Sequence, residues 1–134
     1  MKSYVIRILL SVLMAGVFAF NSHHSAYSYS IDDVATAINS GNVNQLSGYF
    51  DKIVDITLHD RSNTYSRSQA EIVLKDFFHS HGIKTFRIVH KGSNSGSEFC
   101  IGNLQTKYGT FRTTIFMKTR SRKQVLQEIR FEGN

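Results

Sequence analysis

The feature that most constrains the fold is a change of hydrophobic period at Gly82. After this residue, apolar side chains recur at every second position in four segments, over residues 84–91, 98–106, 110–119 and 124–132. Alternation of this kind is typical of half-buried β-strands. Short polar or glycine-containing loops separate the segments, so consecutive strands are expected to be antiparallel neighbours. The C-terminal half of the chain therefore predicts a four-strand meander.

The part of the chain before Gly82 predicts three helices and one further strand. Ser30 is expected to cap the first helix, and Ser66 with Gln69 has the spacing of a capping box that opens the longest helix. Gly82 is the expected stop of that helix, and residues 60–63 are expected to form a turn. The predicted helices cover residues 31–40, 43–49 and 67–81, and the predicted strand covers residues 53–59, with Val54, Ile56 and Leu58 on its apolar side and Asp55, Thr57 and His59 on its polar side. This order is typical of an α+β fold in which one curved sheet packs against three helices.

The N-terminus has the layout of an export signal. Lys2 and Arg7 precede or flank the start of a short apolar run over residues 8–20, and Ala19 offers a small residue for a cleavage site. Because about 18 to 20 apolar residues are needed to cross the hydrocarbon core of a bilayer, this run is too short for a typical membrane span. We expect cleavage near Ala19, and an uncleaved N-terminal anchor is the alternative.

The expected domain organisation follows from this signal. Residues 1–19 are predicted as the signal peptide, 20–30 as a flexible leader and 31–132 as one domain. Cys100 is the only cysteine, so no lipid-modified cysteine follows the apolar run. The sequence therefore predicts a periplasmic or secreted protein with no transmembrane segment after cleavage.

Several short motifs resemble those of a known fold family. The motifs read INSGNV at 38–43, YFD at 49–51, YSRSQAE at 65–71 and LKDFF at 74–78. Together with the closing meander, they resemble the nuclear-transport-factor-2-like superfamily. More narrowly, they resemble a family of small exported Gram-negative bacterial proteins of unknown function. The resemblance implies a cone-shaped half-barrel, in which helix-helix-strand-helix is followed by the four-strand antiparallel meander and the helices pack on the concave sheet face. Members of the superfamily include enzymes and binding or dimerisation modules, so the fold alone does not assign a function.

The concave face is the predicted ligand site. Registers that bury the apolar positions place one set of strand residues inside: Phe86, Ile88, Phe99, Ile101, Phe111, Ile115, Met117, Val125, Ile129 and Phe131. Polar residues of the same parity are His90, Asn103, Gln105, Thr113 and Gln127, and the helix over 67–81 adds Phe77, Phe78 and His81. A mainly apolar cavity with a few polar groups suits a small apolar ligand. The alternative is that these polar groups bond one another and side chains fill the core.

Catalytic residues are not assigned by this pattern. Proton abstraction in such a cavity needs a carboxylate, yet Glu98, Glu128 and Glu132 all have the outward parity. The predicted function is therefore an exported, non-catalytic binding or interaction module. The alternative enzyme is a small lyase or isomerase that uses His81 or His90 as a base, with Asn103 and Gln127 as polarising groups.

Metal and cofactor binding are not expected. His79 and His81 are two residues apart on a predicted helix, so their side chains diverge and cannot chelate one ion. Cys100 has no partner of suitable parity and is predicted to be a buried structural thiol on the outer side of its strand.

The outer sheet face is the predicted partner surface. By parity it carries an apolar stripe of Leu104, Phe116 and Leu126 flanked by Arg112 and Arg130, which could be covered in a homodimer.

Charge is also divided along the chain. Residues 20–83 hold 4 basic and 7 acidic side chains, and residues 84–134 hold 10 basic and 3 acidic ones. The basic cluster comprises Arg112, Lys118, Arg120, Arg122, Lys123 and Arg130. An acidic envelope partner is the expected target of an adaptor of this kind, and nucleic acid is not expected for an exported protein. The alternative is that these cations only protect sheet edges from aggregation.

Overall fold

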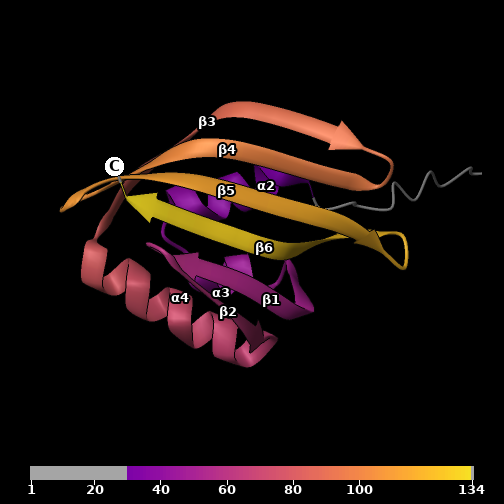
Figure 1. Cartoon of the computed structure of the whole chain (residues 1–134), viewed down its shortest axis with the longest axis horizontal. Helices are drawn as coiled ribbons and strands as arrows, with labels where there is room; N and C mark the ends of the chain where they lie inside the picture. The colour runs from indigo at the N-terminus through magenta and orange to yellow at the C-terminus, as the bar shows by residue number, and fades with distance from the viewer. Residues whose placement is uncertain (1–29, 134) are drawn as a thin grey trace, which may run out of the picture.

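The computed structural model describes residues 30–133, and the predicted signal peptide and nearly all of the leader lie outside this range. The elements along the chain are α2 (Ile31–Asn39), α3 (Val43–Ser47), β1 (Phe50–Leu58), β2 (Arg61–Ser66), α4 (Arg67–His81), β3 (Ile83–Asn94), β4 (Ser97–Thr106), β5 (Gly109–Arg120) and β6 (Lys123–Gly133) (Figure 1). The strands form one six-stranded sheet in the order β2-β1-β6-β5-β4-β3. Neighbouring strands are antiparallel except for β1 and β6, which are parallel. The predicted α+β class is confirmed.

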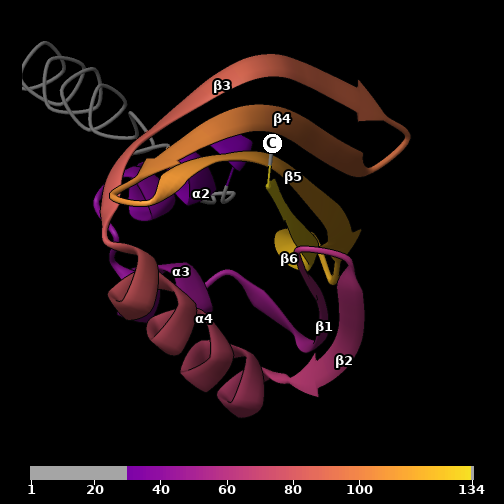
Figure 2. The same cartoon turned by 60° about the vertical axis from the view of Figure 1, so that its left-hand side comes forward.

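The sheet bends around the helices. Figure 2 shows β3, β4 and β5 arching over α2, with α3 and α4 below and β1 and β2 closing the side. One core cluster joins the helices to the sheet, and its fully buried members include Val34, Leu74, Ile115, Ile129 and Phe131. No helix within residues 30–133 is long and apolar enough to cross a membrane.

The helix boundaries follow local signals that were predicted. Ser30 and Ser66 are N-caps, and each forms a capping box with the third helical residue, Asp33 and Gln69 respectively. Gly82 ends α4 at φ +65, and its N–H donates to Phe78 O at 3.0 Å. These predictions are confirmed, because capping depends on residues close in sequence.

Strand β2 is a correction to the predicted layout. Residues 60–63 were expected to form a turn, but Arg61–Ser66 pairs along β1, with Val54 opposite Tyr65 and Leu58 opposite Arg61. Only Tyr65 in this strand is half-buried, and its other side chains are exposed. An edge strand of polar residues has no hydrophobic alternation, so the sequence pattern could not indicate it.

The predicted inward face is wrong on β4. Leu104 and Cys100 are fully buried opposite Phe111 and Ile115, whereas Asn103 and Gln105 are exposed. Because directly opposed residues share a face, Phe99 and Ile101 also lie on the outer face, opposite Phe116 and Thr114. Strand β4 has apolar residues at both parities, so alternation alone does not choose between them.

Two strand irregularities produce the other corrections. The pairing of β3 shifts between Ile88 and His90, which brings His90 opposite outward-facing Ile101. A second shift, between Phe116 and Met117, brings Leu126 opposite Met117, and Leu126 is fully buried. Leu126 thus takes the inward place expected for Val125. After a bulge, each residue of the strand points to the face opposite to the one that simple alternation predicts. The alternation itself does not indicate where a bulge occurs.

Two glycines allow aromatic rings to lie directly on the sheet. On the concave face, a Cβ added at Gly102 would be 2.6 Å from the Phe86 ring and 2.6 Å from Arg87 O. On the convex face, a Cβ at Gly92 would be 2.3 Å from the Phe99 ring. Glycine within a strand commonly marks such a close approach.

Candidate functional site

The conformation of His59 starts the candidate site. This residue follows the end of β1 with φ +59, and its N–H donates to Phe131 O at 2.9 Å. A positive φ is uncommon for a residue with a Cβ, although histidine adopts it more readily than most. The ring centroid of His59 lies 6.2 Å from that of His81 and 5.6 Å from that of Phe111. Alternation along the strand placed His59 on the polar side. The positive φ of His59 breaks that alternation, which explains why His59 was not predicted as a pocket residue.

His81 is held at the C-terminal end of α4. Its Nδ1 lies 2.9 Å from Phe77 O and 3.1 Å from Ser80 Oγ. Because a carbonyl oxygen can only accept, Nδ1 is the donor in the tautomer that bonds Phe77 O. The carbonyls of His81 and Gly82 both accept from Lys107 N at 3.0 Å, which fixes the end of α4 against the β4–β5 turn.

Phenylalanine rings form the floor beneath the two histidines. The His81 ring centroid is 4.2 Å from that of Phe77 and 5.3 Å from that of Phe111. The ring centroid of Phe77 also lies 5.4 Å from that of Phe111 and 4.7 Å from that of Phe131. Phe78 joins the same cluster through Phe131, at 6.1 Å. The structure thus places Phe77, Phe78 and His81, which were predicted as pocket residues, in one aromatic cluster.

A surface hollow adjoins this cluster. It has a volume of about 630 Å³ and is lined by His59, Asp60, Tyr108, Gly109, Thr110, Phe111, Glu132 and Gly133. Tyr108 stands on its rim with 79% of its surface exposed. A smaller hollow of about 300 Å³ shares His59 and Asp60 and continues towards Tyr65. The larger volume lies within the usual range for small-molecule sites. We refer to His59, His81, Phe77, Phe111 and Tyr108 as the mouth site.

The remaining predicted pocket residues do not belong to the mouth site. Thr113 is fully buried, and its hydroxyl donates to Phe111 O at 3.4 Å, so it is a satisfied core residue. His90, Asn103 and Gln105 lie exposed on the outer face. Their predicted placement in a cavity is wrong, for the strand-parity reasons given above.

Gln127 lies in a different place, beside Asp51 near the start of β1. Its Nε2 donates to Asp51 Oδ2 at 3.1 Å, and Arg120 Nε donates to the same oxygen at 3.2 Å. Burial alone would raise the pKa of Asp51. The opposite effect is larger and holds this pKa below 3.8, because the carboxylate accepts hydrogen bonds from Gln127 and from the Lys52 N–H and lies beside the charge of Arg120. Gln127 is therefore part of a structural brace. The alternative catalytic set of His90, Asn103 and Gln127 is not assembled.

Cys100 is fully buried on the concave side of β4. Burial raises the pKa of its thiol to about 12, so the thiolate is scarcely populated at neutral pH. The predicted buried thiol is confirmed, but its predicted outer position is wrong.

The predicted apolar stripe on the outer face is also corrected. Leu104 and Leu126 are fully buried under the sheet, whereas Phe116, Arg112 and Arg130 do lie on the outer face. Arg130 is paired with Glu128 on its own strand. Phe99 and Ile101 accompany Phe116 on the outer face. We call Phe99, Ile101 and Phe116 the convex patch.

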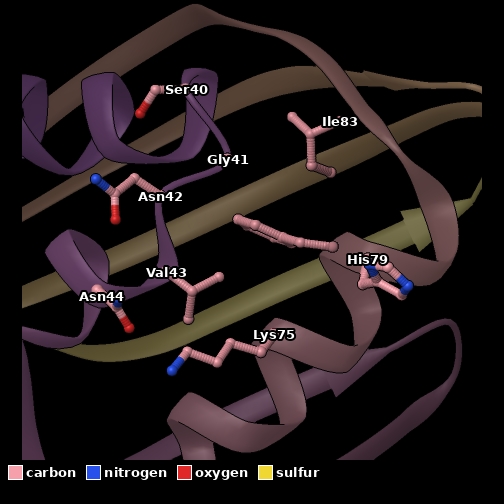
Figure 3. Close-up of a pocket in the computed structure, with 9 residues that line it drawn as sticks. Ser40, Gly41, Asn42, Val43, Asn44, Lys75, His79 and Ile83 are labelled. Atoms are coloured by element: carbon pink, nitrogen blue, oxygen red, sulfur yellow. The ribbon is translucent and has the colours of Figure 1, made fainter.

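A second large hollow lies between α4 and the turn that joins α2 to α3. Figure 3 shows Lys75 and His79 extending from α4, with Asn42 and Asn44 on the other side. The hollow has a volume of about 570 Å³. Lys75 Nζ is 3.0 Å from Glu71 Oε1, so its charge is already paired. His79 lines this hollow, whereas His81 belongs to the mouth site.

Comparison with known proteins gives the following findings. Residues 31–132 match the family described as Domain of unknown function (DUF4783). A DUF4783 family protein from Bacteroides uniformis ATCC 8492 is 29% identical with a TM-score of 0.76, covering 79% of this chain and 98% of that chain. A DUF4783 family protein from Bacteroides fragilis YCH46 is 30% identical with a TM-score of 0.75, covering 80% and 100%. No curated protein matches the chain.

More distant likeness concerns the fold alone. An NTF2-like protein of unknown function from Cytophaga hutchinsonii ATCC 33406 is 6% identical with a TM-score of 0.58, covering 78% of this chain and 86% of that chain. The resemblance to the nuclear-transport-factor-2-like superfamily is confirmed at the level of the fold, and the Bacteroides relatives are from Gram-negative bacteria.

Proposed function

The chain belongs to the DUF4783 family, and we propose that it is an exported, non-catalytic binding module that holds a small, largely apolar ligand at the mouth site. The family has no established function, so the proposal depends on the chemistry of this chain.

One observation supports the proposal above all others. Two histidines from separate elements, His59 and His81, rest on Phe77 and Phe111 beside a hollow of about 630 Å³. Aromatic rings favour a flat apolar ligand, and the imidazole nitrogens can bond a hydroxyl or carbonyl group on it. The left-handed backbone of His59 carries a steric cost, and such conformations cluster at ligand sites.

Binding is favoured over catalysis by the nature of the nearby acids. The carboxylates that line the hollow, on Asp60 and Glu132, are exposed, whereas a base that abstracts a proton in a cavity is surrounded by apolar side chains. Of the residues in the alternative enzyme, only His81 belongs to the mouth site.

The ligand proposal can be tested with the neutral dye Nile red, whose emission rises in apolar surroundings. The His59→Asn variant removes the ring but keeps a residue that tolerates positive φ, and Tyr108→Ser removes an exposed rim side chain. Each is expected to weaken dye binding roughly fivefold, which corresponds to about 1 kcal/mol of lost contact. Ile72→Ser is the matched control, because Ile72 is 68% exposed on α4 and lines neither the two hollows at His59 nor the hollow at Lys75 and His79. Equal binding by all four proteins would refute the assignment, as would no binding by the wild type.

Export is the part of the proposal that rests on the sequence. The basic residues Lys2 and Arg7 and the apolar run over 8–20 support it. Intact-mass measurement of protein purified from the periplasm should find cleavage near Ala19. Recovery of the full-length chain only in the cytoplasm would contradict export.

We propose homodimer formation through the convex patch as a second function of the fold. All three described helices lie on the concave side, so this part of the sheet has no cover from within the described chain (Figure 2). Phe99 and Phe116 form a directly opposed cross-strand pair, with Ile101 beside them. Aromatic residues and arginine are both enriched at protein interfaces, and Arg112 and Arg130 lie on the same face as the patch.

The dimer can be tested by light scattering at micromolar concentration. Phe116→Lys should convert a dimer to a monomer without unfolding it, because Glu128 lies opposite position 116 and can pair with the new charge. Val89→Lys, at an exposed position on edge strand β3, is the control for added charge. A wild-type monomer, or a Phe116→Lys dimer, would rule the interface out.

A further inference from the structure

The β5–β6 hairpin ends in a concentrated positive charge. Strand β5 ends at Arg120 and β6 begins at Lys123, with Ser121 and Arg122 as the two-residue connection. Residues 118–123 contain four cations, Lys118, Arg120, Arg122 and Lys123, and no acid. We call these four residues the basic tip. Figure 1 shows the connection at the right-hand end of the molecule.

The backbone of the connection is unusual for its residues. Ser121 has φ +47 and Arg122 has φ +66, the left-handed pattern of a tight hairpin turn. Glycine or asparagine is preferred at such positions, because in other residues the Cβ atom comes too close to the following carbonyl oxygen. The chain therefore has an arginine in this turn in spite of a steric cost.

The charges of the tip are mostly unpaired. Arg120 Nε donates to Asp51 Oδ2 at 3.2 Å, and this ion pair braces the hairpin against the start of β1. Lys118, Arg122 and Lys123 have no ion pair with any residue in the described range 30–133. Three cations are thus free to meet an external anion.

The described chain also begins at this end of the molecule. Ile31 N donates to Glu98 Oε2 at 3.2 Å, at the start of β4. Thr119 N donates to Gly96 O at 2.7 Å, which joins the same β3–β4 hairpin to the basic tip. Whatever precedes Ser30 in the chain is therefore attached on the side of the basic tip. In the sequence, this preceding part includes the apolar run over residues 8–20.

We propose that the basic tip docks on an anionic phospholipid surface. A single small anion needs donors that converge in a pocket, whereas the tip presents its cations on the outside of a hairpin turn. A membrane surface offers many phosphate charges, and basic residues close to it each gain attraction. The N-terminal apolar run meets a membrane during export, before the cleavage proposed near Ala19, and the described chain begins on the side of the tip, which favours a membrane over a soluble polyanion.

This inference concerns a surface separate from the mouth site. Asp51, beside the tip, and His59, in the mouth site, lie at opposite ends of the nine-residue strand β1. Lys123 of the tip and Phe131, whose carbonyl oxygen accepts from the His59 N–H, are eight residues apart on β6, which is roughly 25 Å at about 3.3 Å per residue. A ligand in the mouth site and a membrane at the tip can therefore be bound together.

The test is co-sedimentation with vesicles of 30% phosphatidylglycerol in phosphatidylcholine, using the protein as purified from cells. The Lys118→Gln, Arg122→Gln, Lys123→Gln triple variant should bind at least tenfold more weakly than wild type, since each cation near such a surface contributes roughly fivefold. The matched control is Arg61→Gln, Lys84→Gln, Arg87→Gln, which removes the same charge from exposed residues elsewhere and should stay within about twofold. Wild type and the two triple variants have the same N-terminus, so a difference in their vesicle binding is due to the substituted side chains and not to the N-terminus.

A single variant separates binding from folding. Arg122→Gly relieves the left-handed backbone, so its melting temperature should equal or exceed that of wild type while its vesicle binding falls roughly fivefold. The proposal is overturned if the triple variant binds like wild type, if the control triple loses as much, or if pure phosphatidylcholine vesicles bind equally well. Tip-dependent retention on heparin without vesicle binding would identify a soluble polyanion instead and would also overturn it.

Discussion

Replacing Gly102 by alanine should test how the sheet obtains its shape. An added Cβ would lie 2.6 Å from the Phe86 ring on one side and 2.6 Å from the backbone oxygen of Arg87 on the other. Neither neighbour has room to retreat, because Phe86 is only 6% exposed and the Arg87 oxygen is part of the β3 backbone. The ring must leave the core or the two strands must separate.

The cost can be worked from these contacts. Overpacking a core position costs about 1–3 kcal/mol, and expelling a buried phenylalanine ring costs about 1.5–3 kcal/mol more. The lower entropy of the unfolded chain returns about 0.4–1 kcal/mol. The net loss in free energy of unfolding is therefore about 3 kcal/mol, which lowers the melting temperature of a domain of this size by about 12–24 °C.

Gly92→Ala is the matched control, measured beside Gly102→Ala by urea and thermal unfolding. Its added Cβ would meet only the ring of Phe99, which is half-buried on the convex face and can swing towards solvent. A loss below about 1 kcal/mol is expected. If Gly102→Ala stays within about 1 kcal/mol of wild type, or if both variants lose the same stability, the packing of Phe86 on β4 does not fix the sheet as described.

Three further predictions concern the brace, the thiol and a helix cap. Asp51→Asn should cost about 1–2 kcal/mol at pH 7 by weakening its bonds to Gln127 and Arg120. The pKa of Asp51 in the folded state is below 3.8, so its contribution to the free energy of unfolding is complete above pH 3.8 and is lost as the pH falls through the folded-state pKa. The free energies of unfolding of wild type and variant, measured in urea, should therefore converge in acid. A difference that stays constant with pH would contradict this. Cys100 should react with a thiol reagent at pH 8 only on unfolding, and fast reaction of the native protein would show that it is accessible. Ser66→Ala should cost about 1 kcal/mol of unfolding free energy, whereas Ser66→Asp should cost less than half of that because aspartate also caps, and equal losses would refute the cap.

The parts of the fold that depend on neighbouring residues could be predicted. The three helices start and stop at local signals such as Ser66 and Gly82, and alternation after Gly82 was enough to indicate four strands, although not which face of each is buried. Strand β2 could not be predicted, because its polar side chains pack against little and its backbone pairing with β1 alone defines it.

Which side of a strand is buried could be predicted only where the apolar residues occur at every second position and not at both parities. On β5, Phe111 and Ile115 are buried as expected. On β4, both Phe99 and Leu104 fit an inward place, and the choice depends on Phe86 lying over Gly102. The bulges on β3 and between β5 and β6 then reverse the faces without any change in composition.

The mouth site was half predictable for a related reason. Phe77 and His81 lie on the apolar side of a clear helix. His59 reaches them only because its own φ is positive and Phe131 fixes its N–H, both of which are tertiary properties. A polar residue directly after a strand and before a turn is the one sequence signal that could have drawn attention to it.

The most direct test of the central claim is a titration of ¹⁵N-labelled protein with 2-naphthol, a flat neutral ring with one hydroxyl, followed by amide chemical shifts. The mouth site predicts saturable shifts concentrated at His59, residues 108–111 and residues 132–133, the backbone that lines its hollow. Shifts concentrated instead at the convex patch or at the hollow of Lys75 and His79, or no saturable shift at all, would contradict the account.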